Sequence, residues 1–201
     1  MEHKSGFVNI IGHPNVGKST LMNALVGEKL SIITSKAQTT RHRIMGIVNG
    51  DDFQIIYSDT PGIVKPHYKL HESMMKFVQL AIEDADVFLL VTEKGDPAFE
   101  ESFITKLNSL NRPIVAILNK IDLCEQAEVL PLIQKLEATF PSAIVIPASA
   151  LHKFNLERVF DTLIEKLPLS PAYYPKDELT DRSVRFFVSE IIREKILMYF
   201  K

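Results

Sequence analysis

Apolar and polar residues alternate in blocks along this chain, and the blocks predict repeated strand–helix units. Four continuous apolar runs have the length of strands buried on both faces, at residues 7–11, 87–91, 113–118 and 143–146. Segments with apolar side chains at helical spacing follow these runs, at residues 19–26, 71–85, 98–110, 127–139 and 155–167. This alternation predicts an α/β fold, in which a mostly parallel sheet carries helices on both faces.

Two further apolar segments, residues 44–48 and 53–57, flank an Asn-Gly-Asp-Asp turn and predict a β-hairpin. The hairpin adds one antiparallel strand, so we expect six strands in total. Upstream of it, residues 28–43 are polar with little periodicity. A polar stretch of this length inside a compact domain is usually a functional loop.

Two of the expected helices carry more detailed predictions. The helix at residues 71–85 should bury the apolar side chains on one of its faces, namely Leu70, Met74, Val78, Ala81 and Ala85. The helix at residues 127–139 contains Pro131, which we expect near its first turn, because a proline further inside removes a backbone hydrogen bond.

The pattern changes after residue 167. Residues 168–180 contain three prolines and are expected to form a linker between a domain at residues 1–167 and a helix at residues 181–201. Asp181 is the candidate N-cap of that helix. Its apolar face combines Val184, Phe187, Val188, Ile191 and Ile192. Such a helix either docks on the first domain or begins a second one.

Composition excludes some classes of protein. The 201 residues carry a net charge of -2, so no global basic excess indicates nucleic-acid binding. Cys124 is the single cysteine, which rules out an internal disulfide and fits a reducing, cytoplasmic setting. The sequence shows no signal peptide and no apolar run long enough to span a membrane.

The first chemical motif follows the first strand and has the phosphate-loop pattern Gly-x-x-x-x-Gly-Lys-Ser. Its candidate nucleotide-binding residues are Gly12, His13, Pro14, Asn15, Val16, Gly17, Lys18, Ser19 and Thr20. Lys18 can reach the β- and γ-phosphates, and the Ser19 hydroxyl can ligate Mg²⁺. The alternative is a chance glycine-rich turn, which the strand before and the helix after the motif disfavour.

A second motif, at the end of the second hairpin strand, completes the expected phosphate and metal site. Its candidate nucleotide-binding residues are Asp59, Thr60, Pro61 and Gly62. Asp59 would hold Mg²⁺ through water, Gly62 would donate its N–H to the γ-phosphate, and Thr40 would close on the metal. The expected metal ligands are therefore Ser19, Thr40 and Asp59, and the expected catalytic residues are Asn15, Lys18, Thr40 and Gly62. A loop hydroxyl without a role is the alternative for Thr40 and its neighbour Thr39.

The third motif selects the base. Asn119-Lys120-Ile121-Asp122 places a carboxylate where guanine offers its N1–H and N2 amine, a donor pair that adenine lacks. Asn119 can tie this loop to the phosphate loop, and the Lys120 stem can lie over the base. A last group of candidate nucleotide-binding residues follows the final strand, with Ala150 offering its N–H to guanine O6: Ser149, Ala150 and Leu151.

Together these residues resemble the translation-factor-related small GTPases. The segment from Gly12 to Leu21 looks like the phosphate loop of the Era and TrmE-type branch. Four other segments narrow the resemblance to the Era family: residues 37–44, 173–175, 180–186 and 189–195. The resemblance covers essentially the whole chain. It implies a P-loop NTPase G domain followed by the first helix of a C-terminal KH domain, which the chain leaves unfinished.

The resemblance also implies a function. Members of the Era family are bacterial GTPases that bind GTP, GDP and Mg²⁺ and assist small (30S) ribosomal subunit assembly. The family binds the 3′ region of 16S rRNA through the full KH domain, and part of it associates peripherally with the inner membrane. In that branch the asparagine that matches Asn15 can hold K⁺ near the phosphates. We expect a monomer.

Ile63 complicates the hydrolysis step. Ras-type GTPases carry a glutamine there that orients the attacking water, and isoleucine cannot do this. We therefore expect slow hydrolysis without activation and keep a nucleotide-binding scaffold module with negligible hydrolysis as an alternative. A metabolic P-loop kinase is disfavoured by the Asn-Lys-x-Asp motif and by the lack of a lid insertion.

Overall fold

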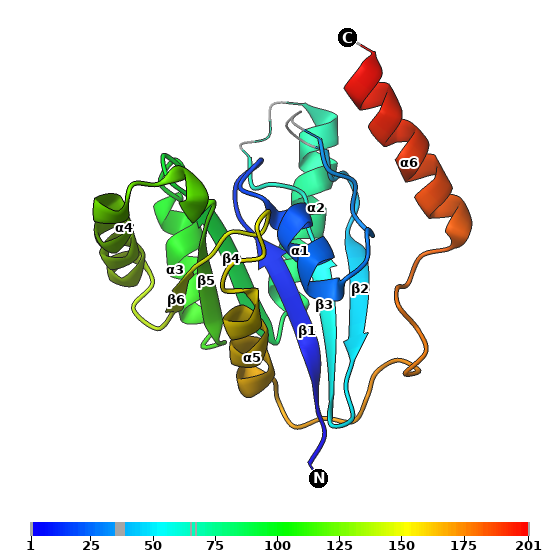
Figure 1. Cartoon of the computed structure of the whole chain (residues 1–201), viewed down its shortest axis with the longest axis horizontal. Coiled ribbons are helices and arrows are strands. Elements are labelled where there is room, and N and C mark those ends of the chain that lie inside the picture. Colours follow the sequence, from blue (N-terminus) through cyan, green and yellow to red (C-terminus); the bar gives the residue numbers. More distant parts are fainter. Residues whose placement is uncertain (1, 35–38, 65, 67, 201) are drawn as a thin grey trace.

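A six-stranded sheet forms the centre of the computed structural model, which describes residues 2–34, 39–64, 66 and 68–200. The strand order is β2-β3-β1-β4-β5-β6, and β2 is antiparallel to β3 while the other neighbours are parallel (Figure 1). The strands are β1 (Lys4–Ile11), β2 (Ile44–Asn49), β3 (Phe53–Asp59), β4 (Val87–Glu93), β5 (Ile114–Asn119) and β6 (Ile144–Pro147). The predicted sheet, with its one antiparallel strand, is confirmed.

Helices cover both faces of the sheet (Figure 1). They are α1 (Lys18–Val26), α2 (Lys69–Asp84), α3 (Glu101–Ser109), α4 (Gln126–Thr139), α5 (Leu156–Lys166) and α6 (Val184–Tyr199). The apolar side chains of α1 and α5 share one core with one face of the strands, and those of α2 and α3 share a second core with the other face. This two-sided burial explains why the strands are continuous apolar runs.

The strand order fixes where a ligand can bind. Strand β1 pairs with β3 on one side and with β4 on the other. The chain runs from β1 to β2 and β3 on one side and later continues from β4 to β5 and β6 on the other, so the order of the sheet reverses between β1 and β4. Open α/β sheets bind ligands outside the carboxyl ends of the strands at this point. The loops that follow β1, β3 and β5 are the three that carry the sequence motifs.

Three predicted helices differ from the structure. In α2, which begins at Lys69, the expected core residue Leu70 is exposed, and His71 is buried in line with Met74 and Val78. Helix α3 begins at Glu101 instead of residue 98, since Phe99 leaves the helical path and stacks on His13. Pro131 lies in the second turn of α4, not the first.

The segment before the last helix makes contacts that the sequence does not predict. Residues in the expected linker at 168–180 dock on the β2–β3 hairpin: the buried Gln54 side chain accepts from the backbone N–H groups of Tyr173 and Tyr174. Leu179 accepts from the N–H of Ile47 on the outer edge of β2. This segment thereby covers the hydrogen-bonding groups of an edge strand.

Helix α6 stands beside β2 (Figure 1). Its N-cap is Ser183, and Asp181 instead accepts from the N–H of Met45 at 3.4 Å. Among the described residues, no helix has the length and apolarity to cross a membrane. Of the expected functional loop at 28–43, residues 35–38 lie outside the described part, including Ala37 and Gln38 from the family-like segment.

Candidate nucleotide-binding site

The phosphate loop turns sharply between β1 and α1. Gly12, Asn15 and Gly17 have positive φ angles of 151°, 66° and 96°, which leave the loop wrapped around the start of α1. A cavity of about 460 Å³ opens over it. Its lining includes ten of the predicted residues: Pro14, Asn15, Gly17, Lys18, Ser19, Thr20, Thr40, Thr60, Gly62 and Lys120.

The close approach of the loop to the sheet gives a stability prediction. A Cβ on Gly12 would lie 2.2 Å from the carbonyl oxygen of Val91, at a φ that L-residues rarely adopt. We expect Gly12→Ala to lower the free energy of unfolding by about 3 kcal/mol, from steric overlap and backbone strain together. Urea unfolding followed by circular dichroism measures this.

Gly27 supplies the matched control for that variant. It has a φ of +84°, but a Cβ there would meet no atom within 4 Å. Gly27→Ala should therefore show the backbone strain alone, about 1 kcal/mol. Equal losses in the two variants would contradict the assigned steric overlap.

Lys18 lies at the floor of the cavity. Its Nζ donates to the carbonyl oxygen of His13 at 2.6 Å, and only 6% of the residue is exposed. Burial lowers the pKa of the ammonium from its ordinary value to about 8, although Asp59 and Asp96 oppose the shift. A desolvated cation at this position gains strongly from an anionic ligand.

The three predicted metal ligands meet at one point. The Ser19 hydroxyl donates to Oδ2 of Asp59 at 2.6 Å and lies 3.0 Å from the Thr40 hydroxyl, which is 3.3 Å from the same carboxylate oxygen. Asp59 is fully buried, and its Oδ1 has no hydrogen-bond partner among the described residues. Burial raises the pKa of this carboxyl, while the Ser19 hydroxyl opposes the shift. Two hydroxyls and a buried, half-satisfied carboxylate form a set of hard oxygen donors that suits Mg²⁺.

The predicted tie between the base loop and the phosphate loop is present. Asn119 donates from Nδ2 to the carbonyl oxygen of the buried Val16 at 2.8 Å. Its Oδ1 accepts from the N–H of Ala150 at 2.9 Å, so that N–H is engaged here and does not point freely toward guanine O6 as we expected. Lys120 donates to the carbonyl oxygen of Asn15 at 2.7 Å and pairs with Glu93. Asn119 thus holds three loops together.

The remaining base-binding candidates lie farther out. Asp122, in a short 3₁₀ turn (Ile121–Leu123), is 3.7 Å from Nε2 of His152. Ser149 is buried, whereas Leu151 is exposed. A second cavity of about 290 Å³ includes Ala150 and Leu151 in its lining and shares Thr20 and Ile33 with the first. The two cavities together offer an elongated site that runs from the phosphate loop to the base loop.

Two residues of the second motif have structural contacts. The Thr60 hydroxyl donates to the carbonyl oxygen of Ile10 at 2.7 Å, which fixes β3 to β1 at the cavity floor. Pro61 is buried beside it. The N–H of Ile63 donates to the carbonyl oxygen of Gly12 at 3.0 Å, and this bond places Gly62 at the cavity wall.

Sequence reasoning missed a group behind the phosphate loop. The His13 ring stacks on Phe99, with 4.4 Å between the ring centroids, and its Nδ1 lies 3.1 Å from Oδ1 of Asp96. Asp96 and Phe99 belong to the loop between β4 and α3. No sequence motif marks them, because the contact joins residues more than eighty positions apart.

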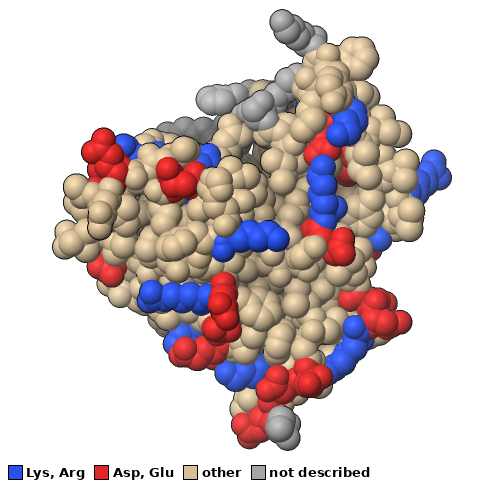
Figure 2. Space-filling model, viewed as in Figure 1, with Lys and Arg blue, Asp and Glu red and all other residues tan. Residues whose placement is uncertain are grey.

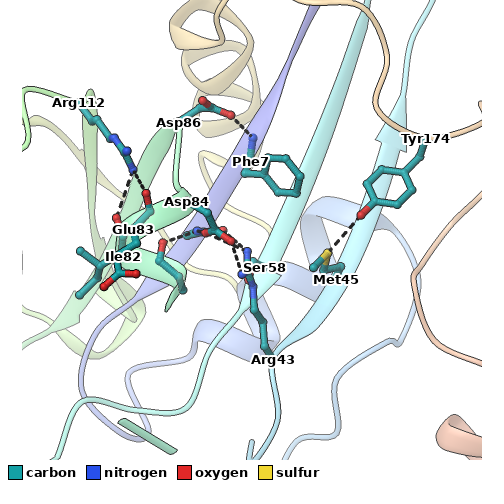
Figure 3. Close-up of polar contacts among 12 residues, drawn as sticks. Phe7, Arg43, Met45, Ser58, Ile82, Glu83, Asp84, Asp86, Arg112 and Tyr174 are labelled. Atoms are coloured by element: carbon teal, nitrogen blue, oxygen red, sulfur yellow. Dashed lines mark hydrogen bonds and ion pairs between the residues drawn. The ribbon is translucent and has the colours of Figure 1, made fainter. Parts of the chain in front are cut away.

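A polar network at the end of the functional loop was missed as well (Figure 3). Arg43 donates from Nε to the hydroxyl of Ser58 at 2.6 Å and pairs with both carboxylate oxygens of Asp84. Asn9 on β1 donates to the same Asp84. Since Ser58 precedes Asp59 and Arg43 lies shortly after Thr40, the network fixes two metal-site segments to the sheet.

Comparison with known proteins identifies relatives of this arrangement. Residues 7–120 match the family model described as "50S ribosome-binding GTPase". A solved structure of Era in complex with MgGDPNP and nucleotides 1506–1542 of 16S ribosomal RNA is 39% identical, with a TM-score of 0.92, over 99% of this chain and 68% of that chain. An Aquifex aeolicus Era variant bound to GDP and AlF4⁻ is 39% identical, with a TM-score of 0.92, over 98% of this chain and 68% of that chain.

A more distant structure shares the fold alone. The elongation factor SelB of Methanococcus maripaludis, in complex with the GTP analogue GppNHp, is 21% identical. It matches with a TM-score of 0.64 over 83% of this chain and 34% of that chain.

Proposed function

The chain belongs to the Era family and is a GTPase, and from this premise we propose that it hydrolyses GTP to GDP and phosphate as a nucleotide-dependent switch in small (30S) ribosomal subunit assembly and 16S rRNA maturation. The observation that carries the proposal is the convergence of Lys18, the Ser19–Thr40–Asp59 cluster and the Asn119 loop around one elongated site. The relatives bound to MgGDPNP and to GDP with AlF4⁻ support the choice of ligand.

Different residues of the chain would bind the phosphates and the Mg²⁺ ion. Lys18 would exchange its contact with the His13 carbonyl for the β- and γ-phosphates, and the loop N–H groups at the start of α1 would complete the anion site. Ser19, Thr40 and Asp59 would hold Mg²⁺, which neutralises charge on the transferred phosphoryl group when bound. Gly62, held through Ile63, would meet the γ-phosphate with its N–H.

K⁺ at Asn15 forms part of the proposal. Asn15 is exposed at the cavity and has a positive φ, while its backbone carbonyl is fixed by Lys120. Its side-chain oxygen could hold K⁺ beside the phosphates, where a cation would offset the charge of the transition state. Ile63 offers no polar side chain for that task.

Asn15→Ala should spare nucleotide affinity and lower the hydrolysis rate. We expect a loss of about tenfold to a hundredfold in kcat in potassium buffer, which corresponds to about 1.4–2.7 kcal/mol of lost transition-state stabilisation. Phosphate release measured in potassium and in sodium buffers tests this. Equal wild-type rates in the two buffers would count against K⁺, and a weakened Kd for GDP in the variant would assign Asn15 to binding instead.

Base recognition and RNA recognition complete the proposal. Asp122 would accept from guanine N1–H and N2, while Ser149, Ala150 and Leu151 border the base. The relative with nucleotides 1506–1542 of 16S rRNA supports an RNA partner. We place that contact in the full KH domain, of which residues 181–201 would be the first helix. On the face in Figure 2, basic and acidic side chains are interspersed, so this face offers no continuous basic surface for RNA, in keeping with a contact made by the full KH domain.

We choose between the two ribosomal subunits by how much of the chain each comparison covers. The matching family model names the large subunit and covers residues 7–120, whereas the relative with 16S rRNA matches 99% of the chain. We therefore favour the small subunit. For the cell, we propose a monomeric cytoplasmic protein that associates peripherally with the inner membrane.

A scaffold module with negligible hydrolysis remains the second candidate, favoured by the apolar Ile63. Phosphate release from GTP, measured with and without 30S subunits, separates the two functions. Phosphate release that 30S subunits accelerate would support the switch. Nucleotide binding without release under either condition would support the scaffold.

A further inference from the structure

Helix α6 buries a carboxylate where its apolar residues would be expected. Glu194 is 1% exposed and Glu190 is 7% exposed, and they are the two buried residues of this helix. The apolar side chains Val188, Ile191 and Ile192 are exposed. Burying a charge is costly unless it is paired and hydrogen-bonded, so the contacts of Glu194 must offset its desolvation.

The two hydrogen bonds of Glu194 both lead to one short segment near the nucleotide site. Glu194 accepts from the backbone N–H of Ile33 through Oε1 at 3.1 Å and from Nζ of Lys29 through Oε2 at 2.8 Å. Lys195, at 3.7 Å, adds a second cation. Although burial opposes it, these partners hold the pKa of the Glu194 carboxyl below its ordinary value, so the group is charged near neutral pH.

The segment at residues 29–33 is a wall of the candidate nucleotide site. Ile32 and Ile33 line the larger cavity, and Lys29 and Ile33 line the smaller one. The segment belongs to no helix or strand. Apart from a bond from the Leu30 N–H to the Glu28 carbonyl oxygen at 3.1 Å, the hydrogen bonds that hold its backbone come from side chains.

Two side chains hold this wall from opposite sides. Asn23 on α1 accepts from the N–H groups of Leu30 and Ser31 at 3.0 and 2.9 Å and donates to the Ser31 carbonyl at 2.7 Å. Glu194 on α6 holds the end that lines both cavities. Asn23 lies on α1, the helix that follows the phosphate loop, whereas Glu194 lies about 160 residues after the wall in the sequence.

We propose that Glu194 is a positioning residue of the nucleotide site, which fixes the 29–33 wall from α6 and thereby slows nucleotide dissociation. The inference rests on the proposed function, because it assumes that the cavity holds a guanine nucleotide. Glu194 acts through Lys29 and Ile33 and contacts no nucleotide itself. Its removal should change how long a nucleotide stays bound and leave the chemistry on bound GTP unchanged.

Glu194→Gln tests this with an isosteric change in the complete chain. The glutamine can still accept from Ile33, but it loses the negative charge that pairs with Lys29. We expect fluorescently labelled GDP to dissociate about tenfold faster, measured by stopped flow against excess unlabelled GDP. The single-turnover rate of GTP hydrolysis should remain within about twofold of wild type.

Glu190→Gln is the matched control. Glu190 lies one turn earlier on the same buried face, but it pairs with Arg193 of its own helix and not with the wall. Its release rate should stay within about twofold of wild type. Equal acceleration in both variants would mean that loosening α6 as a whole, and not the wall contact, is responsible, and would overturn the inference.

Lys29→Met provides an independent route if Glu194→Gln fails to fold. The Lys29 side chain is more than half exposed, and methionine retains the stem while removing the charge. Lys29→Met should also accelerate GDP release. Because both changes break the same contact, the double variant Glu194→Gln/Lys29→Met should accelerate release by less than the product of the two single effects. If the wild type binds GDP and Lys29→Met releases GDP at the wild-type rate, the inference is refuted but the proposed function stands. If the wild type does not bind GDP, the proposed function itself is refuted.

Discussion

Lys18→Ala is expected to abolish detectable binding of GTP and GDP. The Lys18 ammonium is nearly buried, and this burial lowers its pKa to about 8 despite Asp59 and Asp96, so the cation gains from direct contact with anionic phosphates. Hydrogen bonds to charged groups contribute about 1.5–3 kcal/mol each. Loss of contacts to two phosphates should therefore raise Kd by a factor of about one hundred or more. Titration with fluorescent GDP measures the effect.

Lys94→Ala is the control for that experiment. Lys94 is a partly exposed cation that pairs with Glu128 at the surface and lies outside the cavity lining. Its variant should bind GDP as the wild type does, which would show that a general loss of positive charge is not responsible. Binding by Lys18→Ala within a few-fold of wild type would contradict the assigned role of the lysine.

The sheet and the phosphate loop could be predicted because their signals are local. A buried strand needs an apolar run, and a loop that encloses phosphate needs Gly12, Gly17 and Lys18 at fixed spacing. The tie from Asn119 to Val16 was also predictable, because carboxyl ends of neighbouring parallel strands meet at one edge.

Residues that act across the fold could not be found in this way. Apolar periodicity grouped Phe187 with side chains that are exposed, but it could not show that the inward side of α6, on which Phe187 packs, also carries Glu190 and Glu194. Similarly, Arg43 and Asp84 look like ordinary surface charges in sequence, and Asp96 lies in a loop without a motif. Each gains its role from a partner distant in the chain.

The expected linker illustrates the same limit. Its prolines correctly indicate that residues 168–180 form no helix or strand, but they predict nothing about docking. The contacts of Gln54 with the backbone of Tyr173 and Tyr174 depend on a buried amide on β3 that no sequence motif marks. Composition therefore predicts a linker here, but not that this linker covers the edge of β2.

Asp122→Asn is expected to reverse the base preference of the site. A carboxylate accepts from both guanine N1–H and N2, whereas asparagine presents an NH₂ group toward one of these donors. A site built to hydrogen-bond its ligand discriminates strongly when a buried polar group is left unpaired. We expect the Kd for GDP to rise by about a hundredfold, or about 2.7 kcal/mol.

Binding of xanthosine diphosphate distinguishes a changed hydrogen-bond preference for the base from a general loss of binding in the variant. The C2 carbonyl of xanthosine diphosphate can accept from the new asparagine, while its N1–H can still donate to the side-chain oxygen. Asp122→Asn should therefore bind xanthosine diphosphate more tightly than GDP, and the wild type should show the opposite order. Asp51→Asn, an exposed change in the β2–β3 turn, is the control and should leave both affinities unchanged. Loss of both ligands in Asp122→Asn, with an unfolding midpoint lowered in parallel, would assign Asp122 to the stability of the loop and not to base recognition.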